Sequence, residues 1–176
     1  MPTDTRIVLL TLILAAAVAV PAAAQSTAAA TRPAPVVEGA LGWAGFGDEG
    51  IIHHGLVGGA ARFYVSPRFS LGPEVVYMVG PGQDRDLFVT GNLMFDVLAP
   101  MAATPRRVTP FLVAGGGLFR HSDRFLTGTF ASTEGAFTVG LGVRGWTTRR
   151  TFVAVDARMG WELHIRLSAI VGVALD

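Results

Sequence analysis

Residues 152–175 read FVAVDARMGWELHIRLSAIVGVAL. Every odd-numbered position in this stretch is apolar, from Val153 to Leu175. Every charged residue falls on an even-numbered position, and these are Asp156, Arg158, Glu162 and Arg166. A period of two predicts β-strands that present one apolar and one charged face.

The same alternation extends back to Val37. It divides the chain into eight segments of about ten residues, separated by turn-like stretches. The segments that we predict as strands are 37–46, 55–65, 69–79, 86–98, 108–120, 133–146, 152–162 and 164–175. The odd face carries residues such as Leu93, Val139 and Val171. The even face carries the strand charges, which are Glu38, Arg62, Glu74, Asp86, Asp96, Arg120, Glu134, Arg144, Asp156, Arg158, Glu162 and Arg166.

This separation of faces decides which side of the sheet meets which solvent. Unpaired charges in an apolar core cost several kcal/mol each, and Arg facing lipid near the bilayer midplane costs about 2–4 kcal/mol. Both costs are avoided if the charges pair inside a closed barrel and the apolar face meets lipid. We therefore predict an all-β fold, an eight-stranded antiparallel up-and-down transmembrane β-barrel with a polar interior filled by side chains. The predicted interior charge network comprises Glu38, Arg62, Glu74, Asp96, Glu134, Arg144, Asp156, Arg158 and Arg166.

The composition agrees with this fold and excludes other classes. Hydrophobic residues make up 51% of the 176 residues and charged residues 15%, yet beyond the N-terminus no apolar run approaches the roughly 20 residues of a spanning helix. The absence of cysteine excludes disulfide scaffolds and thiolate metal sites. A net charge of +1 gives no reason to expect a nucleic-acid partner.

The N-terminus has the pattern of an export signal. Residues 1–24 combine Arg6, an apolar stretch and the small residues Ala22, Ala23 and Ala24, which predicts a secretory signal peptide. Residues 25–36 are rich in Ala, Pro and Thr and predict a flexible leader. The barrel domain is then residues 37–176.

Aromatic residues on the odd positions predict two girdles at the membrane interfaces. With the N-terminus in the periplasm, one belt forms near the outer strand ends and the other near the periplasmic ends. The predicted outer belt is Trp43, Tyr77, Phe119, Phe137 and Trp161, and the predicted periplasmic belt is Phe63, Phe69, Phe95 and Phe111.

The connections also follow from composition. Residues 66–68 and 148–150 predict tight turns, whereas 47–54, 80–85 and 121–132 predict longer loops on the other side. Pro73 lies within a predicted strand and lacks a backbone N–H, so we expect a bulge or hydration there.

Three segments resemble the small outer-membrane β-barrel family that includes OmpA-like and opacity-type surface barrels. They are the strand from Pro110 to Gly117, the strand from Gly72 to Tyr77 and the closing stretch from Arg166 to Leu175. The resemblance implies the outer membrane of a Gram-negative-type bacterium, contact with membrane lipids including the lipopolysaccharide leaflet, and dependence on the barrel-insertion machinery. The chain ends Leu175-Asp176 rather than on the aromatic residue usual in this family.

Candidate chemistry is sparse, and we predict no catalytic residue, no cofactor and no metal ligand set. His164 and Ser168 share a face but lie about 13 Å apart along a strand, too far for a nucleophile–base pair. The adjacent His53 and His54, with Asp48 and Glu49, more often form a solvated loop than a metal site.

The function expected is therefore that of a non-enzymatic, monomeric envelope protein with a structural or surface-interaction role. A lipid-modifying enzyme and a narrow channel or small-ligand barrel are the alternatives. All three require Leu93, Val139 and Val171 to face outward, with Arg144 and Asp156 inside.

Overall fold

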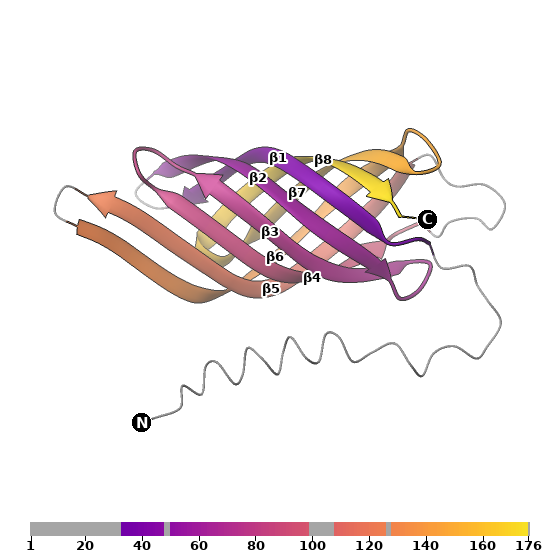
Figure 1. The fold of residues 1–176 in the computed structure, drawn as a ribbon, viewed down its shortest axis with the longest axis horizontal. Helices are drawn as coiled ribbons and strands as arrows, with labels where there is room; N and C mark the ends of the chain where they lie inside the picture. The colour runs from indigo at the N-terminus through magenta and orange to yellow at the C-terminus, as the bar shows by residue number, and fades with distance from the viewer. Residues whose placement is uncertain (1–32, 48–49, 99–107, 126–127, 176) are drawn as a thin grey trace, which may run out of the picture. The chain divides into compact units, whose positions relative to one another are not determined.

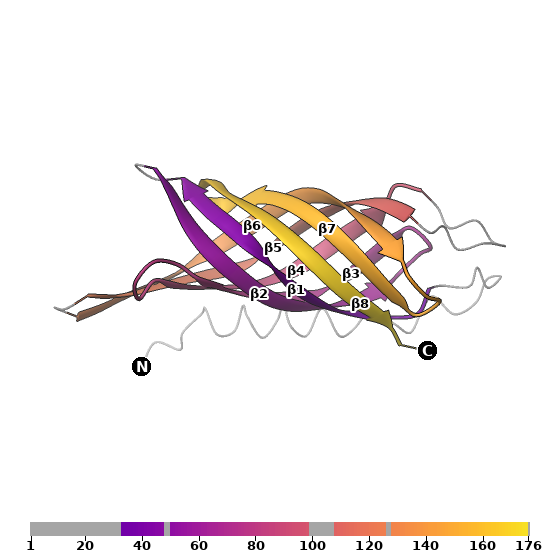
Figure 2. The same ribbon diagram turned by 90° about the horizontal axis from the view of Figure 1, so that it is seen from above.

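The chain forms a closed antiparallel β-barrel in which each strand pairs with its neighbours in sequence and β8 pairs with β1 (Figures 1 and 2). A computed structural model describes residues 33–47, 50–98, 108–125 and 128–175. The strands are β1 (Val36–Gly47), β2 (Ile51–Tyr64), β3 (Phe69–Val79), β4 (Arg85–Asp96), β5 (Val108–Phe125), β6 (Gly128–Trp146), β7 (Thr151–Gly160) and β8 (His164–Ala174). The eight-stranded all-β architecture predicted from the alternation is confirmed.

The barrel has two distinct ends. Val36 at the start of β1 pairs with Ala174 at the end of β8, so the barrel domain begins and finishes at one end, here called the terminal end. The β1–β2, β3–β4, β5–β6 and β7–β8 connections lie at the opposite end, here called the loop end. At the loop end the β5–β6 hairpin projects beyond the other strands (Figure 1).

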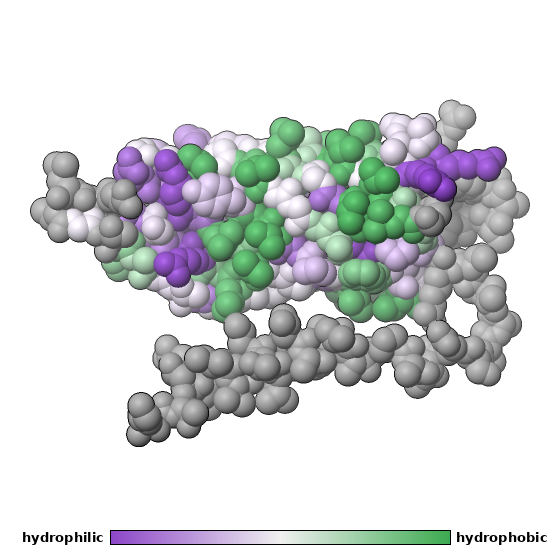
Figure 3. Space-filling view, viewed as in Figure 1, coloured by the Kyte–Doolittle hydropathy of each residue, from purple (hydrophilic) through white to green (hydrophobic). Residues whose placement is uncertain are grey.

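The two faces of the sheet divide as predicted. Leu93, Val139 and Val171 are 47%, 45% and 59% exposed on the outer surface. Arg144 and Asp156 are 2% and 5% exposed in the interior. Hydrophobic residues cover much of the middle of the outer surface, with strongly hydrophilic residues toward both ends (Figure 3). A surface that is apolar around its waist and charged inside is the distribution of a membrane-spanning barrel.

Strand β5 reverses the odd–even rule. Its register with β4 pairs Phe88 with Phe119, an even with an odd position, so the odd residues of β5 point inward. Phe111 and Phe119 are each 1% exposed and belong to the interior, and their predicted place in the aromatic girdle was wrong. Arg120, predicted to point inward, lies on the exposed side.

Two features of the sequence explain this error. The even positions of β5 include Leu112, Ala114 and Leu118, so both faces of the strand are apolar. The alternation of hydropathy therefore did not indicate which face points inward. Inside the barrel, Phe111 is paired with Gly142 of β6, and a Cβ on that glycine would collide with the phenyl ring. The glycine provides the room that the inward ring occupies.

The ladder is incomplete at Pro73. Between β2 and β3 the pairing runs to Ala60 and Glu74 and resumes at Phe63 and Leu71 in the same register. The proline therefore interrupts the ladder without inserting an extra residue. Of the two outcomes expected there, the bulge is not present and hydration stays a prediction. On its other side Pro73 pairs with Gly91 of β4.

The predicted tight turns at the terminal end are confirmed. The Ser66 hydroxyl accepts hydrogen bonds from the Arg68 and Phe69 amides, and the Thr148 hydroxyl does the same for Arg150 and Thr151. At the loop end, much of the predicted loops at 47–54 and 121–132 is strand instead. Their Gly, His, Asp and Thr residues resemble loop composition, but strand pairing continues through them.

The predicted signal peptide at 1–24 and residues 25–32 of the predicted leader lie outside the described residues. In the described part of the chain, no helix is long and apolar enough to cross a membrane. The single short helix there is the 3₁₀ turn η1 (Trp161–Leu163) between β7 and β8.

Candidate functional site: the barrel interior and its loop end

Glu74 of β3 lies at the centre of the interior charges. Its Oε1 accepts from Arg166 Nη2 at 2.6 Å, and its Oε2 lies 3.0 Å from Arg158 Nη2 and 3.3 Å from Arg62 Nη2. These arginines come from β8, β7 and β2, so one carboxylate joins strands from across the barrel. Charge-assisted bonds of this kind are about twice as strong as neutral ones.

Two further carboxylates balance the arginines. Glu38 Oε2 lies 3.0 Å from Arg62 Nη2, and Asp156 Oδ2 accepts from Arg158 Nε at 2.7 Å. The three arginines are thus matched by the three carboxylates Glu38, Glu74 and Asp156. The group carries no net charge, which lowers the cost of holding it away from water.

Arg144 forms a separate site closer to the terminal end. Its Nη1 donates to the Tyr64 hydroxyl at 2.8 Å and lies 3.5 Å from Asp96 Oδ2. The guanidinium carbon is 4.8 Å from the centre of the Phe152 ring and 5.5 Å from that of Phe111, distances typical of cation–π contacts. Phe111 therefore packs against a charged group inside the barrel.

The interior is filled along most of its length. One apolar cluster, which includes Phe46, Phe88 and Phe119, lies between the loop end and the charge network. A second, which includes Met94, Phe111 and Phe152, lies toward the terminal end. Beside Glu38, Glu74 and Arg166 there is a cavity of only about 10 Å³, about the volume of one water probe.

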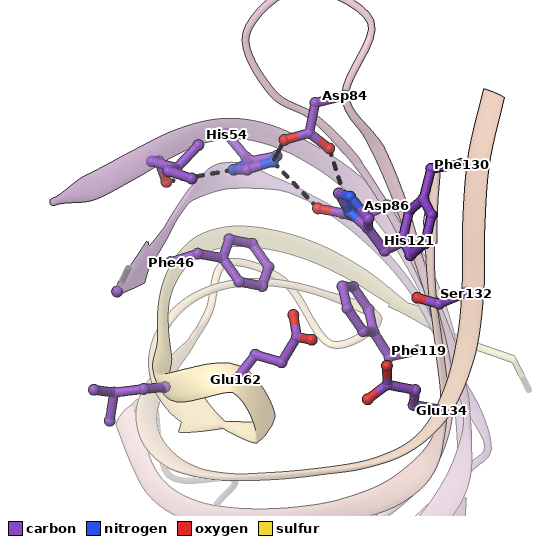
Figure 4. Close-up of a pocket in the computed structure, with 13 residues that line it drawn as sticks. Phe46, His54, Asp84, Asp86, Phe119, His121, Phe130, Ser132, Glu134 and Glu162 are labelled. Atoms are coloured by element: carbon purple, nitrogen blue, oxygen red, sulfur yellow. Dashed lines mark hydrogen bonds and ion pairs between the residues drawn. The ribbon is translucent and has the colours of Figure 1, made fainter. Parts of the chain in front are cut away.

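A larger cavity of about 610 Å³ opens at the loop end. Figure 4 shows side chains from several strands pointing into it. Phe46, Phe119 and Phe130 supply apolar walls, and Glu134 and Glu162 supply carboxylates. Burial raises the pKa of Glu162, which lies in η1, and the neighbouring Glu134 raises it further.

Glu134 was predicted to belong to the interior network, but it lies at this rim. It is exposed and accepts from Trp161 Nε1 at 3.2 Å. The even-numbered residues of β6 do point inward, as predicted, but Glu134 is close enough to the loop end for water to reach it.

A cluster of His and Asp side chains occupies one wall of the cavity. His54 Nε2 lies 2.8 Å from Asp84 Oδ2 and 3.2 Å from Asp86 Oδ2. His121 Nδ1 lies 2.7 Å from Asp86 Oδ1 and 3.5 Å from Asp84 Oδ1. Local spacing does not reveal this group, because each histidine is 30 or more residues from the aspartates that it contacts.

The remaining predicted girdle residues lie on the outside. Phe69 and Phe95 pack with ring centres 4.8 Å apart near the terminal end, and Phe137 and Trp161 pack 6.2 Å apart nearer the loop end. The other outward aromatic side chains are Trp43, Phe63 and Tyr77. Without Phe111 and Phe119, the outward aromatic residues form one group toward each end of the barrel, and their place at the membrane interfaces stays a prediction.

His164 and Ser168 do not meet in the structure. His164 Nδ1 lies 2.5 Å from the Trp161 carbonyl oxygen, and Ser168 is four residues further along β8. Among the described hydrogen bonds, none joins a serine hydroxyl to a histidine ring.

These features define a class of protein, the small eight-stranded β-barrel with an apolar waist, aromatic belts and a neutralised interior. Solved structures confirm that the fold is that of small outer-membrane barrels, as the sequence resemblance implied. Neisserial surface protein A matches with a TM-score of 0.69 and 16% identity, covering 80% of this chain and 97% of that one. The N-terminal barrel domain of Pseudomonas aeruginosa OprF matches with a TM-score of 0.63 and 13% identity, covering 82% and 100%.

A third structure is the attachment invasion locus protein Ail of Yersinia pestis in complex with the heparin analogue sucrose octasulfate. It has a TM-score of 0.50 and 8% identity, covering 82% of this chain and 98% of that one. No protein-family model and no curated protein matches the sequence. The chain therefore shares the fold of outer-membrane barrels. Sequence identities of 16%, 13% and 8% support a shared fold and no more than that.

Proposed function

We propose that the protein is exported and inserts as a monomer into the outer membrane of a Gram-negative-type bacterium, where it has a non-enzymatic structural or surface-interaction role. The observation that carries this proposal is the distribution of side chains. Apolar side chains cover the outside of the barrel and paired charges lie inside it, which is the reverse of an ordinary soluble protein. Such a surface is stable only against hydrocarbon. The signal peptide predicted at 1–24 supplies the export route.

The filled interior supports a non-conducting role. Glu74 and its three arginines cross the middle of the barrel, and the cavity beside them is about 10 Å³. Eight strands enclose just enough space for side chains. We therefore place the protein among plugged barrels that present their loop end to the surroundings.

The test is membrane fractionation followed by electrophoresis of heated and unheated samples of the full chain. The expected result is a band in the outer-membrane fraction whose mobility changes on heating, because folded barrels of this kind resist detergent until heated. A protein found in the periplasmic supernatant, with one mobility under both conditions, would contradict the proposal.

The lipid-modifying alternative is tested at His164, a buried histidine that shares the inward face of β8 with Ser168. Enzymatic acyl transfer needs a nucleophile held beside a base, and among the described residues His164 Nε2 is buried without a hydrogen-bond partner, so no hydroxyl is held against it. We expect a His164→Ala variant to leave outer-membrane lipid composition, measured by mass spectrometry, unchanged. A change that depends on His164 would favour the enzyme instead.

A further inference from the structure

Four side chains from neighbouring strands meet at the wall of the loop-end cavity (Figure 4). His54 comes from β2, Asp84 from the β3–β4 turn, Asp86 from β4 and His121 from β5. The turn that carries Asp84 is itself fixed, since Gly80 N donates to Asp84 O at 3.1 Å and Asp84 N donates to Pro81 O at 3.2 Å. The group is therefore held by the barrel wall and by a tight turn.

The spacing of the polar atoms matches that of ligands around one small metal ion. Tetrahedral Zn²⁺ with bonds of about 2.0–2.1 Å places its ligand atoms about 3.4 Å apart. His54 Nε2 lies 2.8 Å from Asp84 Oδ2 and 3.2 Å from Asp86 Oδ2, whereas His121 Nδ1 lies 2.7 Å from Asp86 Oδ1 and 3.5 Å from Asp84 Oδ1. Candidate ligand atoms of His54, Asp84 and Asp86 all lie within 4.8 Å of one another.

The orientation of His54 gives a second, independent indication. Its Nδ1 lies 3.4 Å from the Ile52 carbonyl oxygen, the partner to which metal-binding histidines commonly donate their second ring nitrogen. With the proton on Nδ1, the Nε2 lone pair faces two carboxylate oxygens. That arrangement is favourable when a metal ion, or a second ring proton, lies between these atoms.

The surroundings also select a cation. His54 and Asp86 are 3% and 2% exposed, so their interactions are weakly screened. Two more carboxylates, those of Glu134 and Glu162, line the same cavity, and the described lining includes no lysine or arginine. Within the described residues, Asp84 Oδ1 is buried and accepts no hydrogen bond, although the His121 Nδ1 lies 3.5 Å from it.

We propose that the loop end binds one divalent transition-metal ion of the Zn²⁺ type through His54 Nε2 and one oxygen each of Asp84 and Asp86. An imidazole ligand favours such an ion over Mg²⁺ or Ca²⁺. The two carboxylates neutralise its charge. His121 Nδ1, 2.7 Å from Asp86 Oδ1, orients that carboxylate from outside the ligand set, and the fourth position of a tetrahedral ion is left to water.

The neighbouring His53 provides a matched control. It lies on the opposite face of β2, where its Nδ1 accepts from Trp43 Nε1 at 3.2 Å. Adjacent histidines on a strand point to opposite faces, so the pair cannot chelate one ion together. His53 belongs to the outer surface and not to the cluster.

The experiment uses the full chain, folded in detergent, stripped with a chelator and titrated with Zn²⁺ by calorimetry. Co²⁺ binding is followed in parallel through its visible absorption, which is intense only in tetrahedral sites. The variants are His54→Gln, which removes a ligand, His121→Ala, which removes the partner of Asp86 Oδ1, and His53→Ala as the control. Heat-modified mobility checks that each barrel is folded, which separates failure of the metal site from failure of the proposed membrane barrel.

We expect one Zn²⁺ per chain and tetrahedral Co²⁺ bands in the wild type and in His53→Ala. We expect affinity at least tenfold weaker in both His54→Gln and His121→Ala, with loss of those bands in His54→Gln. A folded wild type that binds no Zn²⁺ would show that the cluster holds only imidazolium–carboxylate pairs and would overturn the proposal. Equal affinity in all four proteins, or a preference for Ca²⁺, would overturn it as well.

Discussion

Glu74 forms ion pairs with three arginines that come from three different strands. Without its carboxylate, the interior group would hold three arginines against two carboxylates. We predict that Glu74→Gln destabilises the barrel by about 3–5 kcal/mol, because breaking a buried ion pair exposes an uncompensated charge. The measurement is urea unfolding in lipid vesicles followed by tryptophan fluorescence. Arg149→Gln, in the exposed β6–β7 turn, is the control and should change stability by no more than about 0.5 kcal/mol. Equal effects of the two substitutions would show that the interior charges do not stabilise the fold.

Gly142 is a second residue whose identity the interior dictates. A Cβ there would meet the Phe111 ring and, at 2.5 Å, the Val155 carbonyl oxygen. We predict that Gly142→Ala costs about 1–3 kcal/mol through overpacking. Gly39 has nothing within 4 Å of the same position, so Gly39→Ala should be nearly neutral in the same unfolding assay. A neutral Gly142→Ala would mean that Phe111 does not point inward.

At this scale the sequence predicted the charged interior better than the loop-end cluster. Glu38, Arg62 and Glu74 lie inside because strand parity alone places them there. His54 and Asp84 are 30 residues apart, and only the registers of β2 with β3 and of β3 with β4 bring them together. Register is set by the closed sheet as a whole, and local spacing does not reveal it.

Among the elements, β5 is where the structure departs from the sequence pattern. We predict that a tryptophan at Leu112 is quenched by brominated lipids and that one at Val113 is not, since Leu112 is exposed and Val113 is 3% exposed. The test needs a background in which Trp43, Trp146 and Trp161 are replaced by Phe. Quenching at position 113 without quenching at position 112 would show that the odd-numbered residues of β5 face lipid, as they do in the other seven strands.

The other seven strands were predictable because their inward positions carry charges that lipid excludes. Strand β7, for example, places Asp156 and Arg158 on one face and Val153 and Val155 on the other. Strand β5 has apolar residues on both faces, so hydropathy could not fix its orientation. The ends of β2, β5 and β6 were missed because exposed strand ends have the composition of loops.

For the whole molecule, the filled interior predicts an absence of conductance. The purified protein in planar bilayers should show no stepwise current above leak, since Glu74, Arg158 and Arg166 cross the middle of the barrel. Recordings of the wild type are the direct check. Regular, single-sized current steps would mean that this network opens, and the narrow-channel alternative would then replace a plugged barrel.

The orientation of the faces toward lipid underlies the whole account, and spin labelling tests it most directly. The chain has no cysteine, so single cysteines at Leu93, Val139 and Val171 can be labelled without background. In lipid vesicles, each label should collide frequently with oxygen, which concentrates in hydrocarbon, and rarely with a water-soluble nickel chelate. Labels at these three positions that collide mainly with the nickel chelate would contradict a membrane-spanning barrel.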